Sequence, residues 1–243
     1  MKATAFEFRF RMAIMFAIYC LGFWAPWARY NGSVSTVWLE LSGALASAHW
    51  LSLENATILV TVLAILFALK GTIFRVWGTA YLGANVMQGK SMQGHSVVAA
   101  GPYRYVRNPL YVGSFLMGIA VSILMPPSGA VFFLAAQAIF FFRLILGEEA
   151  YLTAQQGEGY LAYKQKVPRL LRSLRARVPA SAASPHWLAS ALAESYYIGL
   201  TACFLVLAWR YNAYLLMRCV IICFGASLVL RAFVPREEKG STL

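Results

Sequence analysis

The chain has 243 residues, of which 60% are hydrophobic and only 12% are charged. Soluble domains hold about 45–50% apolar and about 25% charged residues, so this composition excludes an ordinary soluble fold and indicates several membrane crossings. The net charge of +12 would suit a nucleic-acid partner, but the basic residues fall between apolar stretches rather than on one face. We attribute them to membrane topology and anionic lipid headgroups, and expect no nucleic-acid role.

Several apolar stretches are long enough to cross a bilayer, which takes about 20 apolar residues in a helix. We predict that a further segment, 37–51, forms an interfacial helix or a reentrant loop. We therefore predict an all-α fold, a polytopic membrane helical bundle of about six transmembrane helices. The candidate spans are 10–27, 53–69 with a continuation toward residue 81, 110–125, 130–146, 187–209 and 213–234.

Lysine and arginine set the expected orientation, because short loops rich in these residues stay in the cytoplasm. They gather before the first span and after the second, fourth and sixth, while the opposite loops carry little beyond Arg29 and Arg210. Both termini and the site are therefore expected in the cytoplasm, in an integral multi-pass protein. Within the second span, Lys70 is expected to snorkel to the interface, whereas Arg75 either snorkels or lines a polar cavity.

The third and fourth spans are joined by residues 125–129, with the sequence Met-Pro-Pro-Ser-Gly. Proline removes a backbone donor and restricts the residue before it, so the helix ends here and a helical hairpin follows. The segment 101–111 enters this hairpin, and Glu148 and Glu149 leave it. Polar groups distant in sequence therefore meet at one cytoplasmic surface, which is the predicted cofactor pocket.

The side chains at this surface suit a small cationic ligand. Tyr103 and Tyr111 offer aromatic faces, Asn108 offers a donor and an acceptor, and Glu148 and Glu149 offer negative charge. Aromatic faces with a carboxylate attract a sulfonium or an ammonium through cation–π contact and charge pairing. Arginine and tyrosine beside a span are also routine interfacial anchors, so the pattern alone favours a site and an anchor equally.

The cysteines predict neither a disulfide nor a metal site. Cys20, Cys203, Cys219 and Cys223 all lie in apolar stretches, without histidine or carboxylate neighbours at metal-binding spacing. Small buried thiols of this kind are usually packing residues.

Two parts of the chain, 88–111 and 148–168, resemble the isoprenylcysteine carboxyl methyltransferase family, within the membrane methyltransferase group that also includes phospholipid N-methyltransferases. The matched pieces are Gln88, His95-Ser96-Val97-Val98, Gly101-Pro102-Tyr103, Arg107-Asn108-Pro109-Leu110-Tyr111 with Gly113, Glu148-Glu149, and the run from Gly157 to Pro168. The resemblance implies S-adenosyl-L-methionine as cofactor. The residues expected to contact it are Gln88, His95, Ser96, Val97, Val98, Tyr103, Asn108, Pro109, Leu110, Tyr111 and Glu148.

Two positions depart from the family's pattern. Asn108 stands where the family usually has histidine, and asparagine keeps the hydrogen bonding but cannot carry a proton. The family's carboxylate-binding arginine falls on Leu144, with Arg143 one residue earlier, a shift that turns a helical side chain by about 100°. The last two spans also lie outside the resemblance. We therefore divide the chain into a methyltransferase core, 1–178, with cofactor-binding segments 88–111 and 143–169, and a linker with two additional helices, 179–243.

The activity that the resemblance implies is methyl transfer to a lipophilic acceptor from the bilayer, most simply the carboxylate of an isoprenylcysteine. Arg143 and Arg107 are candidate partners for an acceptor carboxylate or phosphate, and Glu149 or Glu148 is the candidate base for an amine acceptor. Three alternatives stay open: a phospholipid or other small-acceptor methyltransferase, an NADPH-dependent membrane lipid reductase with a similar Arg-x-Pro-x-Tyr turn, and a non-catalytic membrane protein. The expected partners are the lipophilic substrate and membrane lipids, with no metal and with the oligomeric state open.

Overall fold

The computed structural model describes residues 2–24, 35–83, 99–171, 173 and 175–234. All regular elements in these ranges are helices, which confirms the predicted all-α class. In chain order they are α1 (Ala5–Arg9), α2 (Arg11–Trp24), α3 (Val37–Ser47), α4 (Leu53–Leu82), the 3-10 helix η1 (Gly101–Arg104), α6 (Pro109–Ser122), α7 (Pro127–Lys166), α8 (Trp187–Ala193), α9 (Ser195–Arg210) and α10 (Ala213–Ala232).

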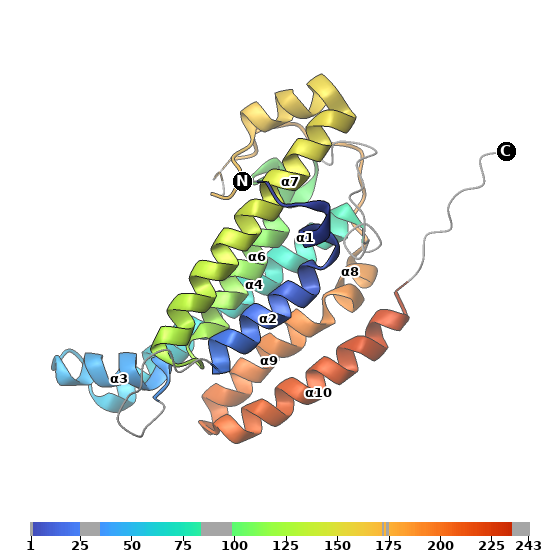
Figure 1. The fold of residues 1–243 in the computed structure, drawn as a ribbon. Coiled ribbons are helices and arrows are strands. Elements are labelled where there is room, and N and C mark those ends of the chain that lie inside the picture. Colours follow the sequence, from blue (N-terminus) through green and yellow to red (C-terminus); the bar gives the residue numbers. More distant parts are fainter. Residues whose placement is uncertain (1, 25–34, 84–98, 172, 174, 235–243) are drawn as a thin grey trace.

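The long helices form an elongated bundle (Figure 1). The hairpin α6–α7 packs against α4, while α2 lies along α7 and α9 lies along α4. The last helix, α10, covers the outer side of α9 (Figure 1). One end of the bundle carries η1, α1 and the second half of α7, and the opposite end carries α3 (Figure 1). The polar residues singled out from the sequence lie at the η1 end.

The helices indicate an integral membrane protein. Within the described ranges, α4, α7 and the part Leu215–Ala232 of α10 are long and apolar enough to cross a membrane, and α8 with α9 adds a fourth span if this pair, bent by 67°, is counted as one. The apolar helices α2 and α6 have 14 residues each. Such a helix is about 21 Å long against a hydrocarbon core of about 30 Å. Helix is present at all six predicted positions, but the count of six spans is not confirmed.

Glycines let α4 and α6 approach closely. A Cβ atom on Gly71 would lie 2.7 Å from the carbonyl oxygen of Gly113, and one on Gly78 would lie 2.8 Å from Leu110 Cδ2. Small residues at helix contacts allow this kind of backbone approach in membrane proteins. The contact at Gly78 holds the first turn of α6, which carries the predicted cofactor residues, against α4.

The predicted hairpin is confirmed, and α3 lies against its turn. The helix α6 ends at Ser122 and α7 begins at Pro127. Thr36 caps α3, and Val37 N donates to Met125 O at 2.9 Å. The indole of Trp38 donates to the hydroxyl of Thr61 at 3.0 Å. Of the two predictions for this segment, the helix is therefore the one observed.

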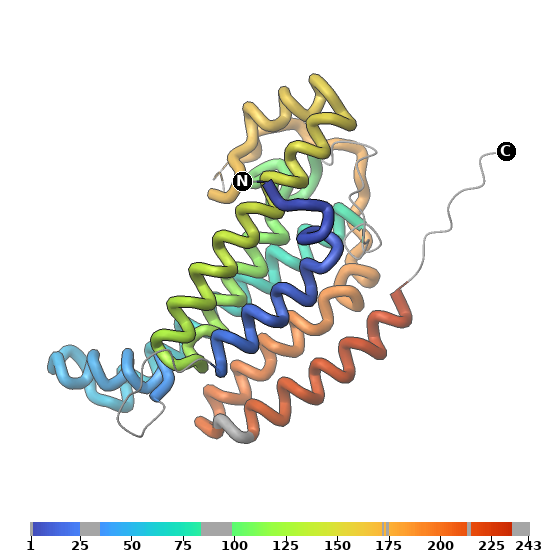
Figure 2. The backbone as a smooth tube through the Cα atoms, in the orientation of Figure 1, coloured from blue at the N-terminus to red at the C-terminus, as the bar shows by residue number. Residues whose placement is uncertain are grey.

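The helix α7 continues far beyond its apolar first half and then changes direction. Gly157, with φ 56° and ψ −130°, interrupts the helix, and a residue with a side chain is strained at such angles. After this break the chain turns back toward the bundle (Figure 2). Tyr160, Tyr163 and Val167 from the returning part form a small separate core. This return brings the residues after α7 to the start of α6.

The C-terminal helices are tied to α4 by a buried ion pair. Arg75 of α4 donates from Nε to Glu194 Oε2 at 2.9 Å and from Nη2 to Glu194 Oε1 at 2.7 Å. Glu194, between α8 and α9, is fully buried and also accepts a hydrogen bond from Thr79 at 2.6 Å. Arg75 therefore points into the bundle rather than snorkelling. Glu194 was not among the predicted functional residues, although an acidic residue inside an apolar stretch indicates a buried partner.

Candidate active site

The two ends of the hairpin meet as the sequence predicted. Tyr111, in the first turn of α6, donates its hydroxyl hydrogen to Glu148 Oε1 at 2.7 Å. Asn108, just before α6, donates from Nδ2 to Glu149 Oε1 at 3.4 Å. Residues about forty positions apart in sequence thus become neighbours at one end of the bundle.

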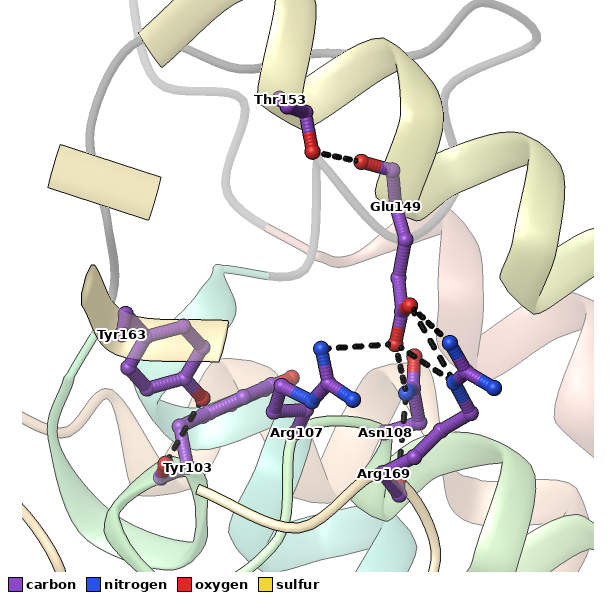
Figure 3. Close-up of polar contacts among 7 residues, drawn as sticks. All are labelled: Tyr103, Arg107, Asn108, Glu149, Thr153, Tyr163 and Arg169. Carbon is purple, nitrogen blue, oxygen red and sulfur yellow. Dashed lines mark hydrogen bonds and ion pairs between the residues drawn. The ribbon is translucent and has the colours of Figure 1, made fainter. Parts of the chain in front are cut away.

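Glu149 lies at the centre of a cluster that we call the Glu149 clamp: Arg107, Asn108, Glu149 and Arg169 (Figure 3). Arg169 donates from Nη2 to Glu149 Oε2 at 2.8 Å and from Nε to Oε1 at 3.1 Å. Arg107 Nη1 lies 3.3 Å from Glu149 Oε1, and the Glu149 side chain is only 3% exposed. A buried carboxylate is stable when several donors and opposite charges surround it, and Glu149 meets this condition.

The clamp joins the start of α6 to the chain that follows α7. Arg107 N donates to Pro168 O at 2.9 Å, and Asn108 Nδ2 donates to Arg169 O at 3.1 Å. Pro109 occupies the first position of α6, where its missing N–H costs nothing. The sequence did not single out Arg169, although it directly follows the Val-Pro pair that closes the matched run.

Tyr103 provides a buried donor that no described residue satisfies. Its backbone carbonyl accepts a hydrogen bond from the Tyr163 hydroxyl at 2.7 Å, which holds η1 in place (Figure 3). The Tyr103 side chain is 8% exposed, and its own hydroxyl has no hydrogen-bond partner among the described residues. Burial raises the pKa of Tyr103, so the phenol stays protonated and available as a donor. Arg107 Nε is a second buried donor without a hydrogen-bond partner in the described part of the chain.

Tyr111 and Glu148 form the other part of the site. The ring of Tyr111 meets the ring of Phe141 edge to face, with centroids 5.3 Å apart. The hydroxyl of Tyr111 also donates to Glu148, so the carboxylate lies next to the Tyr111 side chain. A polar cation is attracted by this combination through its charge and through the ring faces. The arrangement thus offers one negative group and, from Tyr103 and Arg107, unsatisfied donors.

Arg143 is occupied by the N-terminal helix. Its Nε and Nη2 donate to the two carboxylate oxygens of Glu7 at 3.0 and 2.8 Å. Ala3 N donates to Arg143 O at 3.0 Å, so the residues before α1 also lie against α7. The hydrogen bonds from Arg143 and from the Thr4 backbone lower the pKa of Glu7 to about 2. Both candidate arginines, Arg107 and Arg143, therefore already hold a protein carboxylate.

Part of the predicted cofactor site lies outside the described residues: Gln88, His95, Ser96, Val97 and Val98. Pro109 and Leu110 form the first turn of α6 and pack against Gly78 of α4. In the described part of the chain, no group of three or more His, Cys, Asp or Glu side chains is arranged to hold a metal ion.

Part of the chain is similar to a known family and to curated proteins. Residues 62–154 match the model of the "Isoprenylcysteine carboxyl methyltransferase (ICMT) family". The resemblance to this family is confirmed. The matched range contains α6, most of α4, and α7 up to residue 154, with both glutamates. It therefore includes Tyr103, three of the four clamp residues, and the pair Tyr111–Glu148. The fourth clamp residue, Arg169, lies beyond its end.

Curated relatives carry the corresponding name. The chain is 30% identical over 143 residues to "Protein-S-isoprenylcysteine O-methyltransferase" of Xenopus laevis, covering 57% of this chain and 49% of that protein. It is 31% identical over 144 residues to the Homo sapiens protein of the same name, with 57% and 49% covered. To the Schizosaccharomyces pombe protein it is 34% identical over 86 residues, with 35% and 36% covered. The chain thus spans about half the length of the first two. No solved structure matches the chain.

Proposed function

We propose that this protein transfers a methyl group from S-adenosyl-L-methionine to a lipophilic acceptor, the carboxylate of an isoprenylcysteine-like molecule. The observation that carries the proposal is the match of residues 62–154 to the methyltransferase family, because this range contains the Tyr111–Glu148 pair and the unsatisfied donors of the site. The relatives' printed name supplies the acceptor class.

The side chains present fit such a cofactor. S-adenosylmethionine brings an electrophilic methyl group on a sulfonium, next to a ribose and a carboxylate. Glu148 and the face of Tyr111 would hold a positive group by charge and cation–π attraction. The unpartnered hydroxyl of Tyr103 and Nε of Arg107 would donate to oxygen atoms of the cofactor, which removes the cost of leaving them buried and unpaired. Gln88 and residues 95–98 are proposed to complete the site.

The chain's residues would act mainly by binding and orienting. An isoprenylcysteine carboxylate is ionised at neutral pH, so its oxygen can form the new bond to the methyl carbon without a base. The site then gains rate from alignment and from excluding water around opposite charges that neutralise each other. Glu149 is poorly suited to be a base, because Arg107 and Arg169 already pair with its carboxylate. We assign Glu149 to holding the site together.

Arg143 remains the proposed partner of the acceptor carboxylate. Its guanidinium lies on α7 about one and a half turns before Glu148 and is bonded to Glu7, with 27% and 22% of the two side chains exposed. A partly exposed ion pair contributes only modest stability, so an incoming carboxylate could replace Glu7. We also propose that the site and both termini face the cytoplasm, and that residues 179–243 are an addition to a core of residues 1–178.

A methyl-transfer assay in lipid nanodiscs tests the proposed function. The full-length protein receives S-adenosylmethionine with a labelled methyl group and one of three acceptors: an S-farnesylcysteine analogue with a free carboxylate, the same analogue with its carboxylate amidated, or phosphatidylethanolamine. We expect base-labile label only on the free carboxylate, because a methyl ester hydrolyses in base. Label on phosphatidylethanolamine and none on the farnesylcysteine analogue would replace this function with a phospholipid methyltransferase.

A further inference from the structure

A buried polar network connects the C-terminal helices to α4 and α6. At its centre the guanidinium of Arg75 donates two hydrogen bonds to Glu194, between α8 and α9. Arg75 Nη1 also donates to Ser114 Oγ of α6 at 3.3 Å. The same guanidinium lies over the ring of Tyr197 of α9, 4.7 Å from its centroid, and the hydroxyls of Ser114 and Tyr197 are 2.9 Å apart. Arg75 therefore contacts α6, α9 and the junction of α8 with α9.

The place of this charged pair is costly. The helix α4 is long and apolar enough to cross a membrane, and the side chains of Arg75 and Glu194 are only 12% and 0% exposed. Apolar residues of similar size would fill such a space at no greater cost in stability. An ionisable pair inside a membrane protein thus indicates a functional role.

The arginine reaches α6 close to the residue that binds Glu148. A Cβ atom on Gly113 would lie 3.0 Å from Arg75 Cγ, so the stem of Arg75 crosses α6 at this glycine before its head meets Ser114. Ser114 and Tyr111 are three residues apart, and their side chains point in directions about 60° apart on the helix. A rotation of α6 that moved Ser114 away from Arg75 would turn Tyr111 by the same angle. The contact at Ser114 therefore fixes the direction in which Tyr111 faces Glu148.

The C-terminal chain also holds the end of α4 that supports η1. His186 N donates to Ala80 O at 2.8 Å, which satisfies one of the last carbonyl groups of α4. The next residue, Tyr81, packs so closely against Gly101 that a Cβ atom there would collide with its ring. Gly101 begins η1, the element that carries the unpartnered hydroxyl of Tyr103. Residues after 178 thus support both parts of the site that surround the proposed cofactor.

The charges of the pair reach η1 as well. Burial raises the pKa of Tyr103, and among the smaller contributions the charge of Arg75 lowers this pKa while that of Glu194 raises it. The pair is therefore close enough to the site to act on a group that is proposed to bind the cofactor.

We propose that Arg75 and Glu194 are positioning residues of the methyltransferase site, an inference that rests on the proposed function. Glu194 orients the guanidinium of Arg75, and Arg75 holds α6 through Ser114. The helix α6 in turn presents Tyr111 to Glu148. Because Glu194 lies outside the range 62–154 that matches the family, the C-terminal helices supply a support that the matched range does not contain.

A paired apolar substitution separates positioning from stability. Arg75→Met/Glu194→Leu removes both charges together, and such replacement of a buried ion pair often keeps or raises stability. The matched control, Thr72→Val/Thr201→Val, removes a contact of 2.8 Å that also joins α4 to α9 but includes no residue of α6. Ser114→Ala removes the acceptor on α6 and leaves the ion pair intact. We expect all three full-length proteins to unfold in nanodiscs close to the wild-type temperature.

Hydrogen exchange without any ligand tests the positioning of α6. The peptide 109–116 is followed by mass spectrometry in nanodiscs, with a peptide of α9 as internal reference. We expect its amides to exchange about threefold faster or more in Arg75→Met/Glu194→Leu and in Ser114→Ala, because the first turns of α6 open more often. The control should exchange like the wild type. Unchanged exchange of 109–116 in both folded variants would overturn the proposal.

Cofactor affinity tests whether the effect passes through Tyr111. S-adenosylmethionine is titrated by calorimetry into Arg75→Met/Glu194→Leu, and the same double substitution is repeated in a Tyr111→Leu background. We expect the double substitution to weaken binding about tenfold in the wild type but about twofold or less in Tyr111→Leu, because residues that act through one another are not additive. Losses of equal size in both backgrounds, or wild-type affinity in the stable double variant, would overturn the proposal.

The two levels of inference can fail separately. Faster exchange of 109–116 in a protein whose folded wild type binds no S-adenosylmethionine supports the positioning of α6 and contradicts the proposed function. Binding by the wild type, with exchange and affinity unchanged in the double variant, supports the function and overturns the positioning. A wild type that does not bind and a double variant with unchanged exchange contradict both.

Discussion

Two adjacent glutamates of α7 lie in opposite environments. Glu149 is buried and is bound by two arginines and an asparagine. Among the described residues, Glu148 accepts a hydrogen bond from Tyr111, whose ring meets that of Phe141. Successive positions on a helix point about 100° apart, which separates the two carboxylates. Glu149 thus has its charge balanced within the protein, and under the proposed function it would hold the site together, while Glu148 would meet the cofactor.

The largest expected effect is a loss of stability when the charge of Glu149 is removed. Glu149→Gln leaves the buried guanidinium of Arg107 without its opposite charge, and breaking a buried pair costs about 3–5 kcal/mol. We expect thermal unfolding in nanodiscs to occur at a clearly lower temperature. Glu148→Gln is the matched control and should unfold close to the wild type. Equal losses of stability in both variants would contradict the division of roles.

A smaller effect concerns how Arg169 reaches Glu149. Gly157 allows α7 to turn back, and its φ of +56° disfavours any residue with a side chain. Gly157→Ala should lower the free energy of unfolding by about 1 kcal/mol, although open space surrounds the position. Gly159→Ala also enters open space but has ordinary helical geometry, so it should keep or slightly raise stability. Denaturant titration of both variants measures the difference, and a stable Gly157→Ala protein would show that the turn does not need glycine.

The smallest effect lies outside the clamp, at the pair Glu7–Arg143. The pKa of Glu7 is lowered from 4.5 to about 2, so its contribution is present above pH 4.5 and is lost as the pH falls toward 2. Because this ion pair is partly exposed to solvent, we expect only a small change in melting temperature. The melting temperature of the wild type should exceed that of Glu7→Gln above pH 4.5, and this difference should disappear as the pH falls from 4.5 toward 2. A difference in melting temperature that stays constant from pH 6 to pH 2.5 would show that the ion pair does not contribute to stability.

The sequence predicts the hairpin and the meeting of its ends, because both follow from local signals. Pro126 and Pro127 end the first helix of the hairpin. Because its two helices run side by side, the start of α6 with Asn108 and Tyr111 lies next to the part of α7 that carries Glu148. A helix also forms at Val37–Ser47, within the segment 37–51 for which the sequence predicts an interfacial helix or a reentrant loop. The family resemblance depends on ordered motifs and is likewise visible without a structure.

The partners of the charged residues were not predictable, since they depend on tertiary packing. Arg75 pairs with Glu194 across more than a hundred residues. Arg143 pairs with Glu7, and Glu149 gains Arg169 only because α7 turns back at Gly157. The count of about six spans is not confirmed, because the apolar helices α2 and α6 have only 14 residues each. Hydrophobicity reports burial in lipid or protein alike and does not fix helix length.

Cofactor binding tests the central claim most directly. S-adenosylmethionine is titrated by calorimetry into the full-length protein in nanodiscs, with NADPH in parallel, and the wild type is compared with Glu148→Gln and Tyr103→Phe. The second variant removes only the hydroxyl that has no partner among the described residues. We predict saturable binding of S-adenosylmethionine alone, weakened about tenfold or more in both variants, since a hydrogen bond to a charged group contributes about 1.5–3 kcal/mol. A folded wild type that binds NADPH and not S-adenosylmethionine would contradict the account.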